Sequence, residues 1–156
     1  MRLHFTLLAT AAAIASTLAF NTQAATSDWG VHDALEVASV RTPVGSFNDT
    51  YQFSLANVET LFSTAVSNNL TSALNIAGGQ VSLFREAGAV DTTVGSFAFN
   101  DVTGSISHAF GLLGAGDYYY EVSGAGTGSL GGFYTLSSTL LPVTPVPGAD
   151  SLAMML

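Results

Sequence analysis

The sequence contains no cysteine and no lysine, and both absences narrow the classes of protein to which it can belong. Without cysteine there can be no disulfide, no thiol nucleophile, no zinc-thiolate site and no lipobox for attaching a lipid. The three cations are all arginines, against eleven acidic residues, and the formal net charge is −8. Binding to nucleic-acid phosphates or to anionic lipid needs a cluster of cations, and the sequence has none. We therefore predict no nucleic-acid partner.

Charged residues are also scarce, at 9% of the 156 residues, whereas 48% of the residues are hydrophobic. A chain of this length forms one domain by the usual range of about 100–200 residues per domain, and it can bury one core. Exported bacterial proteins often lack cysteine, whereas small secreted eukaryotic domains usually depend on it. The composition favours a single-domain protein of the bacterial envelope.

The first 24 residues have the layout of a secretory signal peptide. One cation, Arg2, precedes an apolar stretch from Leu7 to Phe20, and the small residues Thr22 and Ala24 suit the pockets of a signal peptidase. We predict cleavage after Ala24, with cleavage after Ala25 as the alternative. An apolar helix of about 14 residues is shorter than the ~30 Å hydrocarbon core of a bilayer, which argues against an uncleaved membrane anchor.

From residue 45 onward, short runs of alternating apolar and polar residues are separated by Gly, Asn or Asp. This pattern is typical of antiparallel strands joined by tight turns. The runs are Phe47 to Leu55, Gln80 to Phe84, Ser96 to Phe99, Ser105 to Phe110, Asp117 to Val122 and Gly132 to Leu140. We expect the last two runs to form a hairpin across a Gly-rich loop, and Ala34 to Val40 to be a further strand.

The segment 58–74 is ambiguous, because its apolar residues recur at helical spacing although it also contains several β-branched residues. Short apolar runs cannot be assigned from periodicity alone. We predict a strand over residues 59–67 and allow a helical turn after Asn69.

Six to eight short strands in about 115 residues predict an all-β fold, an antiparallel two-sheet β-sandwich of the jelly-roll-like kind, because the apolar face of each sheet must be covered. Prolines at 142, 145 and 147 then end any strand and favour an extended linker. We expect a signal peptide at 1–24, the sandwich domain at 25–141 and a Pro-rich tail at 142–156.

The densest group of ligand-type side chains is Asp28, His32 and Glu36, which are spaced four apart and would share one face of a helix. Such a face could hold a divalent metal. Because Gly30 disfavours a helix there, we predict no metal and instead a polar N-terminal segment whose Trp29 packs against the sandwich.

The motifs that could carry catalysis are weak. Residues 126–131 match Gly-x-Gly-x-x-Gly, but a strand follows them, so there is no helix N-terminus to receive a pyrophosphate. Residues 127–131 lack the first glycine of a Gly-x-Ser-x-Gly elbow. We therefore predict no catalytic residue, no enzymatic activity and no cofactor.

Four acidic residues could supply a carboxylate pair for glycoside hydrolysis or for Ca²⁺: Asp49, Asp101, Asp117 and Glu121. The sequence selects no pair among them, and aspartates in turns usually serve the turn. For Asp49 we predict local hydrogen bonds that fix its strand. His108, in the run that starts at Ser105, is expected on the surface.

Alternation predicts that Tyr118 and Tyr120 face the core and that Tyr119 faces outward. An outward tyrosine beside a Gly-rich loop can stack on a sugar ring, although cross-strand packing is its commoner role. Trp29, Tyr119 and Tyr134 are the aromatic residues that we consider as contacts for a glycan. They provide the alternative function, a carbohydrate-binding module.

The tail resembles the PEP-CTERM sorting signal, whose usual form is Val-Pro-Glu-Pro-Glu-Thr-Tyr-Ala-Met-Leu-Leu, followed by a transmembrane stretch and an Arg cluster. The residues that match or are similar are Val146, Pro147, Asp150, Ala153 and Met154. Gly148 and Ala149 replace Glu-Pro, and the transmembrane stretch and Arg cluster are absent. We expect a shortened, degenerate signal and no stable membrane insertion.

Residues 47–53 resemble the Phe-x-Asp-x-Phe signature that names one group of PEP-CTERM proteins. The residues concerned are Phe47, Asp49, Tyr51, in place of the second Phe, and Phe53. Residues 115–124 with 132–136 are similar to the closing hairpin of bacterial pre-peptidase-type β-sandwiches. These resemblances imply export, recognition by an exosortase-type sorting enzyme and association with the outer envelope or exopolysaccharide, with no catalytic residues. We therefore expect an exported, non-enzymatic protein of the cell envelope or extracellular matrix.

Overall fold

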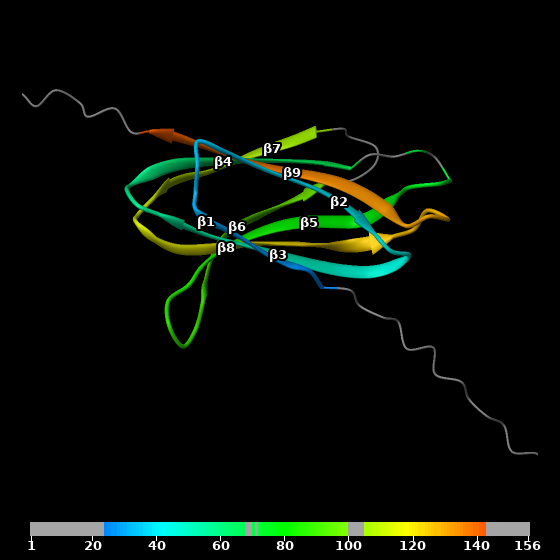
Figure 1. The fold of residues 1–156 in the computed structure, drawn as a ribbon, viewed down its shortest axis with the longest axis horizontal. Coiled ribbons are helices and arrows are strands. Elements are labelled where there is room, and N and C mark those ends of the chain that lie inside the picture. Colours follow the sequence, from blue (N-terminus) through cyan, green and yellow to red (C-terminus); the bar gives the residue numbers. More distant parts are fainter. Residues whose placement is uncertain (1–23, 68–69, 71, 100–104, 143–156) are drawn as a thin grey trace, which may run out of the picture.

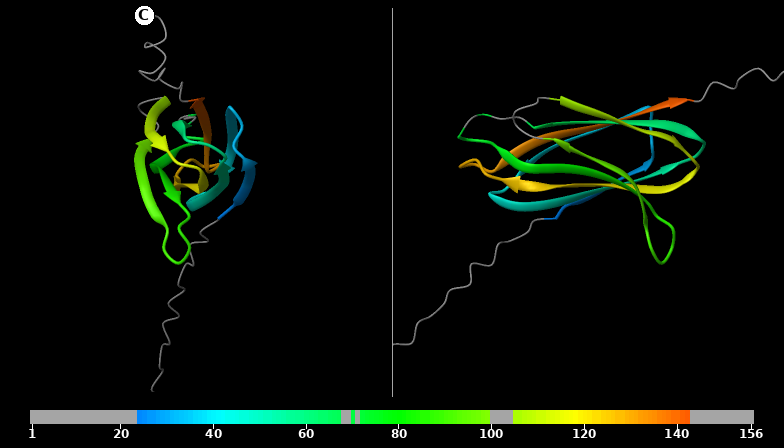
Figure 2. Two further views of the ribbon diagram at one scale, coloured as in Figure 1. Left: turned by 90° about the vertical axis from the view of Figure 1, so that its left-hand side faces the viewer. Right: turned by 180° about the vertical axis from the view of Figure 1, so that it is seen from behind.

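The computed structural model describes residues 24–67, 70, 72–99 and 105–142, and in this part of the chain it contains nine strands and no helix (Figure 1). The strands are β1 Thr26–Val31, β2 Leu35–Thr42, β3 Gly45–Leu55, β4 Glu59–Ser67, β5 Ile76–Arg85, β6 Thr92–Phe99, β7 Ser105–Leu113, β8 Gly116–Gly126 and β9 Gly132–Pro142. They pack as two facing sheets, which the view along the strands in Figure 2 shows as two layers. The predicted all-β sandwich is confirmed.

Successive strands of the chain mostly alternate between the two sheets. One sheet has the order β1-β3-β8-β5-β6 and the other has the order β2-β9-β4-β7. Apart from β5 and β6, consecutive strands lie in opposite sheets, so nearly every connection crosses the sandwich. The strand pairs are antiparallel except for β1 with β3, which is parallel. This crossing pattern is jelly-roll-like and leaves β1 and β2 at one edge, with β6 and β7 at the other.

The predicted hairpin between residues 117–122 and 132–140 is wrong. β8 pairs with β3 and β5, whereas β9 pairs with β2 and β4 in the other sheet. The Gly-rich link between them therefore crosses the sandwich. Gly131 has a φ of +91°, and a Cβ there would overlap the carbonyl oxygen of Thr42. Alternation reveals a strand but not its sheet, and sequential strands are neighbours only about two-thirds of the time.

The strand predicted over residues 59–67 is confirmed as β4, and the one predicted over 34–40 is confirmed as β2. β4 has a two-residue burial period, with Leu61 and Ala65 buried. Its outer face also carries Phe62, which is what gave the segment its misleading helical spacing. Residues 68, 69 and 71 lie outside the described residues, so the helical turn allowed there stays a prediction.

The inner faces of the two sheets form one aromatic-rich core. Its buried hydrophobic residues are Phe47, Tyr51, Phe53, Leu55, Leu61, Ala65, Ile76, Val81, Leu83, Phe97, Phe99, Leu113, Tyr118, Tyr120, Val122, Tyr134 and Leu136. Tyr118 and Tyr120 face the core as the alternation predicts, because successive side chains of a strand point to opposite faces.

The last strand ends at Pro142, one residue beyond the predicted end of the domain. The predicted signal peptide, apart from Ala24, and the sorting-motif residues Val146, Pro147, Asp150, Ala153 and Met154 lie outside the described residues. No helix in the described part of the chain is long and apolar enough to cross a membrane.

Candidate functional site

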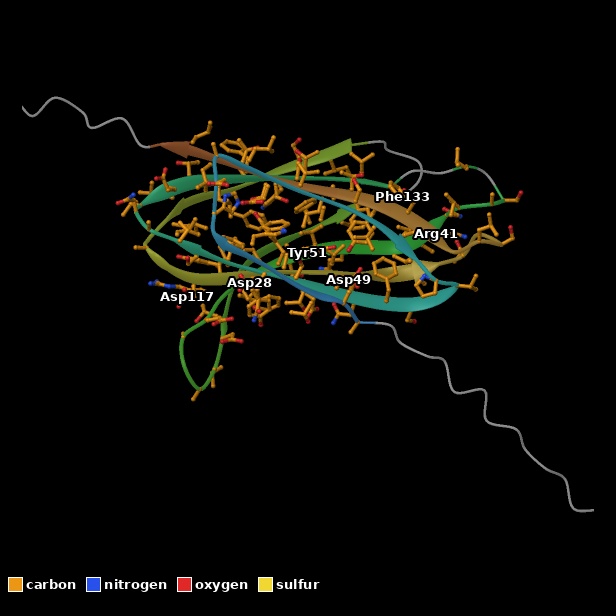
Figure 3. All side chains as sticks on the ribbon, in the orientation of Figure 1. Asp28, Arg41, Asp49, Tyr51, Asp117 and Phe133 are labelled. Carbon is orange, nitrogen blue, oxygen red and sulfur yellow. The ribbon has the colours of Figure 1, made fainter. Side chains whose placement is uncertain are left out.

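The Phe-x-Asp signature lies on the inner face of β3 and meets Tyr134 of the opposite sheet. Figure 3 labels two of its residues, Asp49 and Tyr51. The Tyr134 hydroxyl donates a hydrogen bond to Oδ2 of Asp49 at 2.7 Å, and it accepts one from the Tyr51 hydroxyl at 2.6 Å. The ring of Phe47 stacks on the ring of Tyr134, with centroids 5.6 Å apart and planes at 12°. Three of the four signature residues therefore contact one tyrosine, and together they tie the two sheets to each other.

Asp49 is a buried carboxylate, with 3% of its surface exposed. Its Oδ1 atom accepts a hydrogen bond from the backbone nitrogen of Ala25 at 3.0 Å. The prediction that its hydrogen bonds are local is wrong, because the partners lie 24 and 85 residues away in the sequence. An inward side chain on a sandwich strand faces the other sheet. Its partners are therefore Tyr134 of that sheet and the backbone of Ala25, just before the neighbouring strand β1.

The phenols in this group stay protonated at neutral pH. Burial raises the pKa of Tyr134, and the hydrogen bond to Asp49 raises it further. Burial also raises the pKa of Tyr51. The Tyr134 hydroxyl can therefore donate to the buried carboxylate of Asp49, and the Tyr51 hydroxyl can donate to that of Tyr134.

A second polar group joins His32 to the interior. The Nδ1 atom of His32 lies 2.5 Å from the carbonyl oxygen of Asp33, so Nδ1 carries the proton and donates. The Nε2 atom then accepts from the hydroxyl of Ser138 at 2.7 Å, and Ser138 accepts from the hydroxyl of Tyr120 at 2.9 Å. Burial lowers the pKa of His32, against the raising effects of the Asp33 carbonyl and of the Glu36 and Asp33 charges. The neutral imidazole thus completes a chain of hydrogen bonds between the sheets.

A serine beside a histidine is also the geometry of nucleophilic catalysis. Here the side chain of Ser138 is fully buried, and its hydroxyl hydrogen is directed at His32. A nucleophile needs a place where a reacting atom can lie about 3 Å away, and a fully buried hydroxyl offers no such place. The arrangement therefore serves packing and hydrogen bonding. No motif points to Ser138, although it lies two and four residues after the buried Leu136 and Tyr134 on β9 and so falls on the same inner face.

The helix that would bring Asp28, His32 and Glu36 onto one face does not form. Asp28 lies on β1 and accepts from the backbone nitrogen of Gly30 at 2.8 Å, whereas His32 points inward from the turn before β2. In the ranges that the structure covers, no three His, Asp or Glu side chains lie close enough to hold a metal ion.

Tyr134 was predicted as a possible glycan contact, and this prediction is wrong because its side chain is fully buried. Tyr119 faces outward from β8 and is half-buried by its neighbours. Its ring stacks on Phe84 of β5, with centroids 5.0 Å apart and planes at 15°. Its hydroxyl donates to Oδ2 of Asp91 at 3.0 Å. Cross-strand packing is therefore the contact that Tyr119 makes, and Phe84 and Asp91 were missed because neither belongs to a motif.

Trp29 packs against the sandwich as predicted, with its ring 5.1 Å from the ring of Tyr51. It is half-buried at the edge where β1 and β2 lie side by side (Figure 2). An open cleft of about 300 Å³ lies at this edge, lined by Trp29 and Tyr51 together with Val37, Val40 and neighbouring residues. Trp29 is thus the predicted glycan contact whose ring borders an open cleft.

A shallower depression of about 400 Å³ has an acidic lining. Asp28 of β1, Asp117 of β8 and Glu86 of the loop after β5 contribute to it, and Figure 3 shows Asp28 and Asp117 at the same end of the sandwich. Of the other carboxylates considered for a pair, Asp49 is buried and Asp101 lies outside the described residues. The depression brings Asp117 near acidic groups that the sequence did not associate with it.

His108 was predicted on the surface, but it is half-buried at the edge formed by β6 and β7. Its ring stacks on Phe97, with centroids 5.4 Å apart, and meets Phe110 edge-on at 4.8 Å. The side chain is less exposed than predicted because the rings of Phe97, on β6 of the other sheet, and Phe110 cover it.

Comparison with known proteins gives a likeness of fold. No family model and no curated protein matches the sequence. Among solved structures, the chain is similar to the pre-peptidase C-terminal domain of collagenase from Bacillus anthracis, with 16% identity and a TM-score of 0.50. That match covers 78% of this chain and 99% of the other. The predicted pre-peptidase-type sandwich is therefore confirmed as a fold.

A weaker similarity is to PliG of Aeromonas hydrophila, a periplasmic lysozyme inhibitor of g-type lysozyme. The identity is 18%, the match covers 76% of this chain and 99% of the other, and the TM-score is 0.38. At that TM-score the similarity does not establish a common fold.

Proposed function

We propose that the chain is an exported, non-enzymatic β-sandwich protein of the bacterial cell envelope or extracellular matrix, where it associates with exopolysaccharide. The observation that carries the proposal is the burial of the residues whose side chains could take part in catalysis. Asp49, His32 and Ser138 are all buried and engaged in hydrogen bonds that join separate elements of the fold. Their burial supports a protein whose polar interior maintains its shape.

Export is supported by the layout of the first 24 residues and by the absence of cysteine. The resemblance of the tail to a PEP-CTERM signal supports an exosortase-type sorting enzyme as a partner. The same resemblance, with the Phe-x-Asp signature, supports association with exopolysaccharide.

The proposal is tested with protein purified from the secreted or envelope fraction and exopolysaccharide from the same bacterium. We expect the protein to cosediment with the polysaccharide and to leave its chain-length distribution and its number of reducing ends unchanged. A shortened polysaccharide would show that the protein is an enzyme. Failure to cosediment would contradict the proposed association with exopolysaccharide. A cysteine-free secreted β-sandwich of unrelated sequence is the control for trapping.

The second candidate function is a carbohydrate-binding module, and the cleft beside Trp29 is the observation that favours it. A half-exposed aromatic ring beside polar groups can stack on a sugar ring. Because Trp29 is the only tryptophan of the chain, its fluorescence reports directly on that cleft. Titration with an oligosaccharide should then give a saturable change in fluorescence. The change should be abolished in Val37→Arg, which alters the lining of the cleft, and retained in Tyr119→Ala. This result would establish a carbohydrate-binding module in place of a purely structural protein.

A further inference from the structure

Ala25 is held by two consecutive residues of β3. Its backbone nitrogen donates to Oδ1 of Asp49 at 3.0 Å, and its carbonyl oxygen accepts from the backbone nitrogen of Thr50 at 2.7 Å. Ala25 directly precedes β1, and both Ala24 and Ala25 are exposed. The first residue predicted to remain after removal of the leader is therefore fixed at its nitrogen by a buried carboxylate.

The charge of Asp49 has no cationic partner among the hydrogen bonds of the described residues. Its donors are the amide of Ala25 and the hydroxyl of Tyr134, both neutral in the full-length chain. Arg41 lines the same small cavity as Ala25 and Asp49, but its guanidinium donates to the carbonyl oxygen of Leu130. Burying a carboxylate without a countercharge is costly, which leaves this position suited to a cation.

We propose that proteolytic processing supplies the cation: the α-ammonium group of Ala25, at the surface, forms an ion pair with the buried carboxylate of Asp49 in the mature protein. The inference rests on the export and leader cleavage of the proposed function. Hydrolysis of the Ala24–Ala25 peptide bond by a signal peptidase consumes one water, leaving a carboxylate on Ala24 and an amino group on Ala25. The amino group takes a proton from solvent at neutral pH, because its ordinary pKa is about 7.7–8.0.

The geometry accommodates the new group. A cavity of about 40 Å³ borders Ala25 and Asp49, which is space for about one water molecule to hydrate an ammonium hydrogen that Asp49 does not accept. A charge-assisted hydrogen bond is roughly twice as strong as a neutral one, so processing strengthens a contact that already exists. Cleavage one residue later would remove both hydrogen bonds of Ala25. The ion pair therefore requires cleavage after Ala24 and not after Ala25.

The absence of lysine makes the test unambiguous, because the α-amino group is then the only primary amine of the mature chain. The full-length gene is expressed with its own leader, and the intact mass of the exported protein gives its first residue. An amine-specific acylating reagent is then applied at pH 7 to folded and to urea-unfolded protein. We expect a chain that begins at Ala25 and is acylated about tenfold more slowly when folded, which corresponds to one unit in the pKa of the amine.

Two variants separate the ion pair from simple burial of the amine. Asp49→Asn keeps an acceptor but removes the charge, so acylation of the folded protein should become about tenfold faster. Asp28→Asn removes a carboxylate of β1 that contacts Gly30 and not Ala25, and it should leave the rate unchanged. If Asp49→Asn does not fold, the pH dependence of acylation of the folded wild-type protein decides the question, because a carboxylate partner raises the pKa of the amine above its ordinary range of about 7.7–8.0 whereas burial alone lowers it.

The failures are distinguishable. A protein that begins at Thr26 would leave export intact and overturn the ion pair. A protein that begins at Met1 would contradict leader cleavage and with it the export in the proposed function. A protein that begins at Ala25 but is acylated equally fast when folded and unfolded would show that the amine has no carboxylate partner.

Discussion

At the scale of single residues, the interior of this sandwich contains polar side chains that act in sets. Asp49, Tyr51 and Tyr134 satisfy one another across the sheets, and so do His32, Ser138 and Tyr120. Removing one member leaves a buried donor or acceptor without a partner, and that penalty is usually larger than the net value of the hydrogen bond itself.

Tyr134→Phe should lower the free energy of unfolding by about 1–3 kcal/mol, because Asp49 and Tyr51 each lose a partner in the interior. Urea unfolding followed by Trp29 fluorescence measures the change. Tyr119→Phe is the matched control: it removes a hydroxyl bonded to Asp91 at the surface and should cost less than about 0.5 kcal/mol. Equal losses in the two variants would show that the interior network does not stabilise the fold.

The buried imidazole of His32 makes stability depend on pH. In the unfolded chain His32 takes up a proton near its ordinary pKa of 6.5, whereas burial lowers that pKa in the folded protein. Below about pH 6.5 the unfolded state therefore binds more protons, and the free energy of unfolding falls as the pH falls toward the lower folded pKa.

Melting temperatures between pH 8 and pH 5 test this prediction. His32→Gln should flatten the decline, whatever its effect on stability at pH 8, and His108→Gln should keep the decline of the wild-type protein. A decline that survives in His32→Gln would assign the pH dependence to other groups.

At the scale of the elements, the close crossing between β8 and β9 depends on a glycine. Gly131→Ala should lower the free energy of unfolding by more than Gly88→Ala, although both positions have positive φ. The left-handed backbone alone costs about 1–2 kcal/mol for a residue with a Cβ. At Gly131 the Cβ would also overlap the backbone of Thr42, whereas at Gly88 no atom lies within 4 Å. Equal unfolding midpoints in urea would contradict this account of the crossing.

The strands β2 to β9 could be predicted from the sequence because each one has its own pattern of apolar and polar residues. The strand β1 was missed, because all of its residues except Trp29 are exposed and it shows no such alternation. The segment Phe47 to Leu55 needed no distant information to be identified as β3. The pairing of strands could not be predicted in the same way, since Tyr118 and Tyr134 lie on consecutive strands of similar pattern that belong to different sheets. Only the crossing geometry at Gly131 separates them, and a Gly-rich link is equally compatible with a hairpin.

The same limit applies to the candidate site. Alternation placed Tyr118 and Tyr120 inward, but it could not supply the partner of Asp49, which lies 85 residues away on the other sheet. Tyr134 was considered as a sugar contact because the sequence did not show which face of β9 is turned toward the other sheet. Trp29 was placed correctly because tryptophan is usually largely, though rarely fully, buried.

At the scale of the whole molecule, two sheets are joined by polar contacts through a core of aromatic rings, and one edge carries Trp29 over an open cleft. The chain is acidic overall, with eleven acidic residues, three arginines and no lysine. The buried polar residues Asp49, His32 and Ser138 are of the types that also serve in catalysis, but here they hold the two sheets together. The central claim is that these residues act on the fold and not on a substrate.

Asp49→Ala tests that claim most directly, with stability and polysaccharide association measured on the same preparation. The account predicts a free energy of unfolding lower by about 1–3 kcal/mol, because Tyr134 and Ala25 lose their acceptor. It also predicts unchanged cosedimentation per folded molecule under conditions where the variant is folded. Unchanged stability together with the loss of association, or of any turnover, would contradict it.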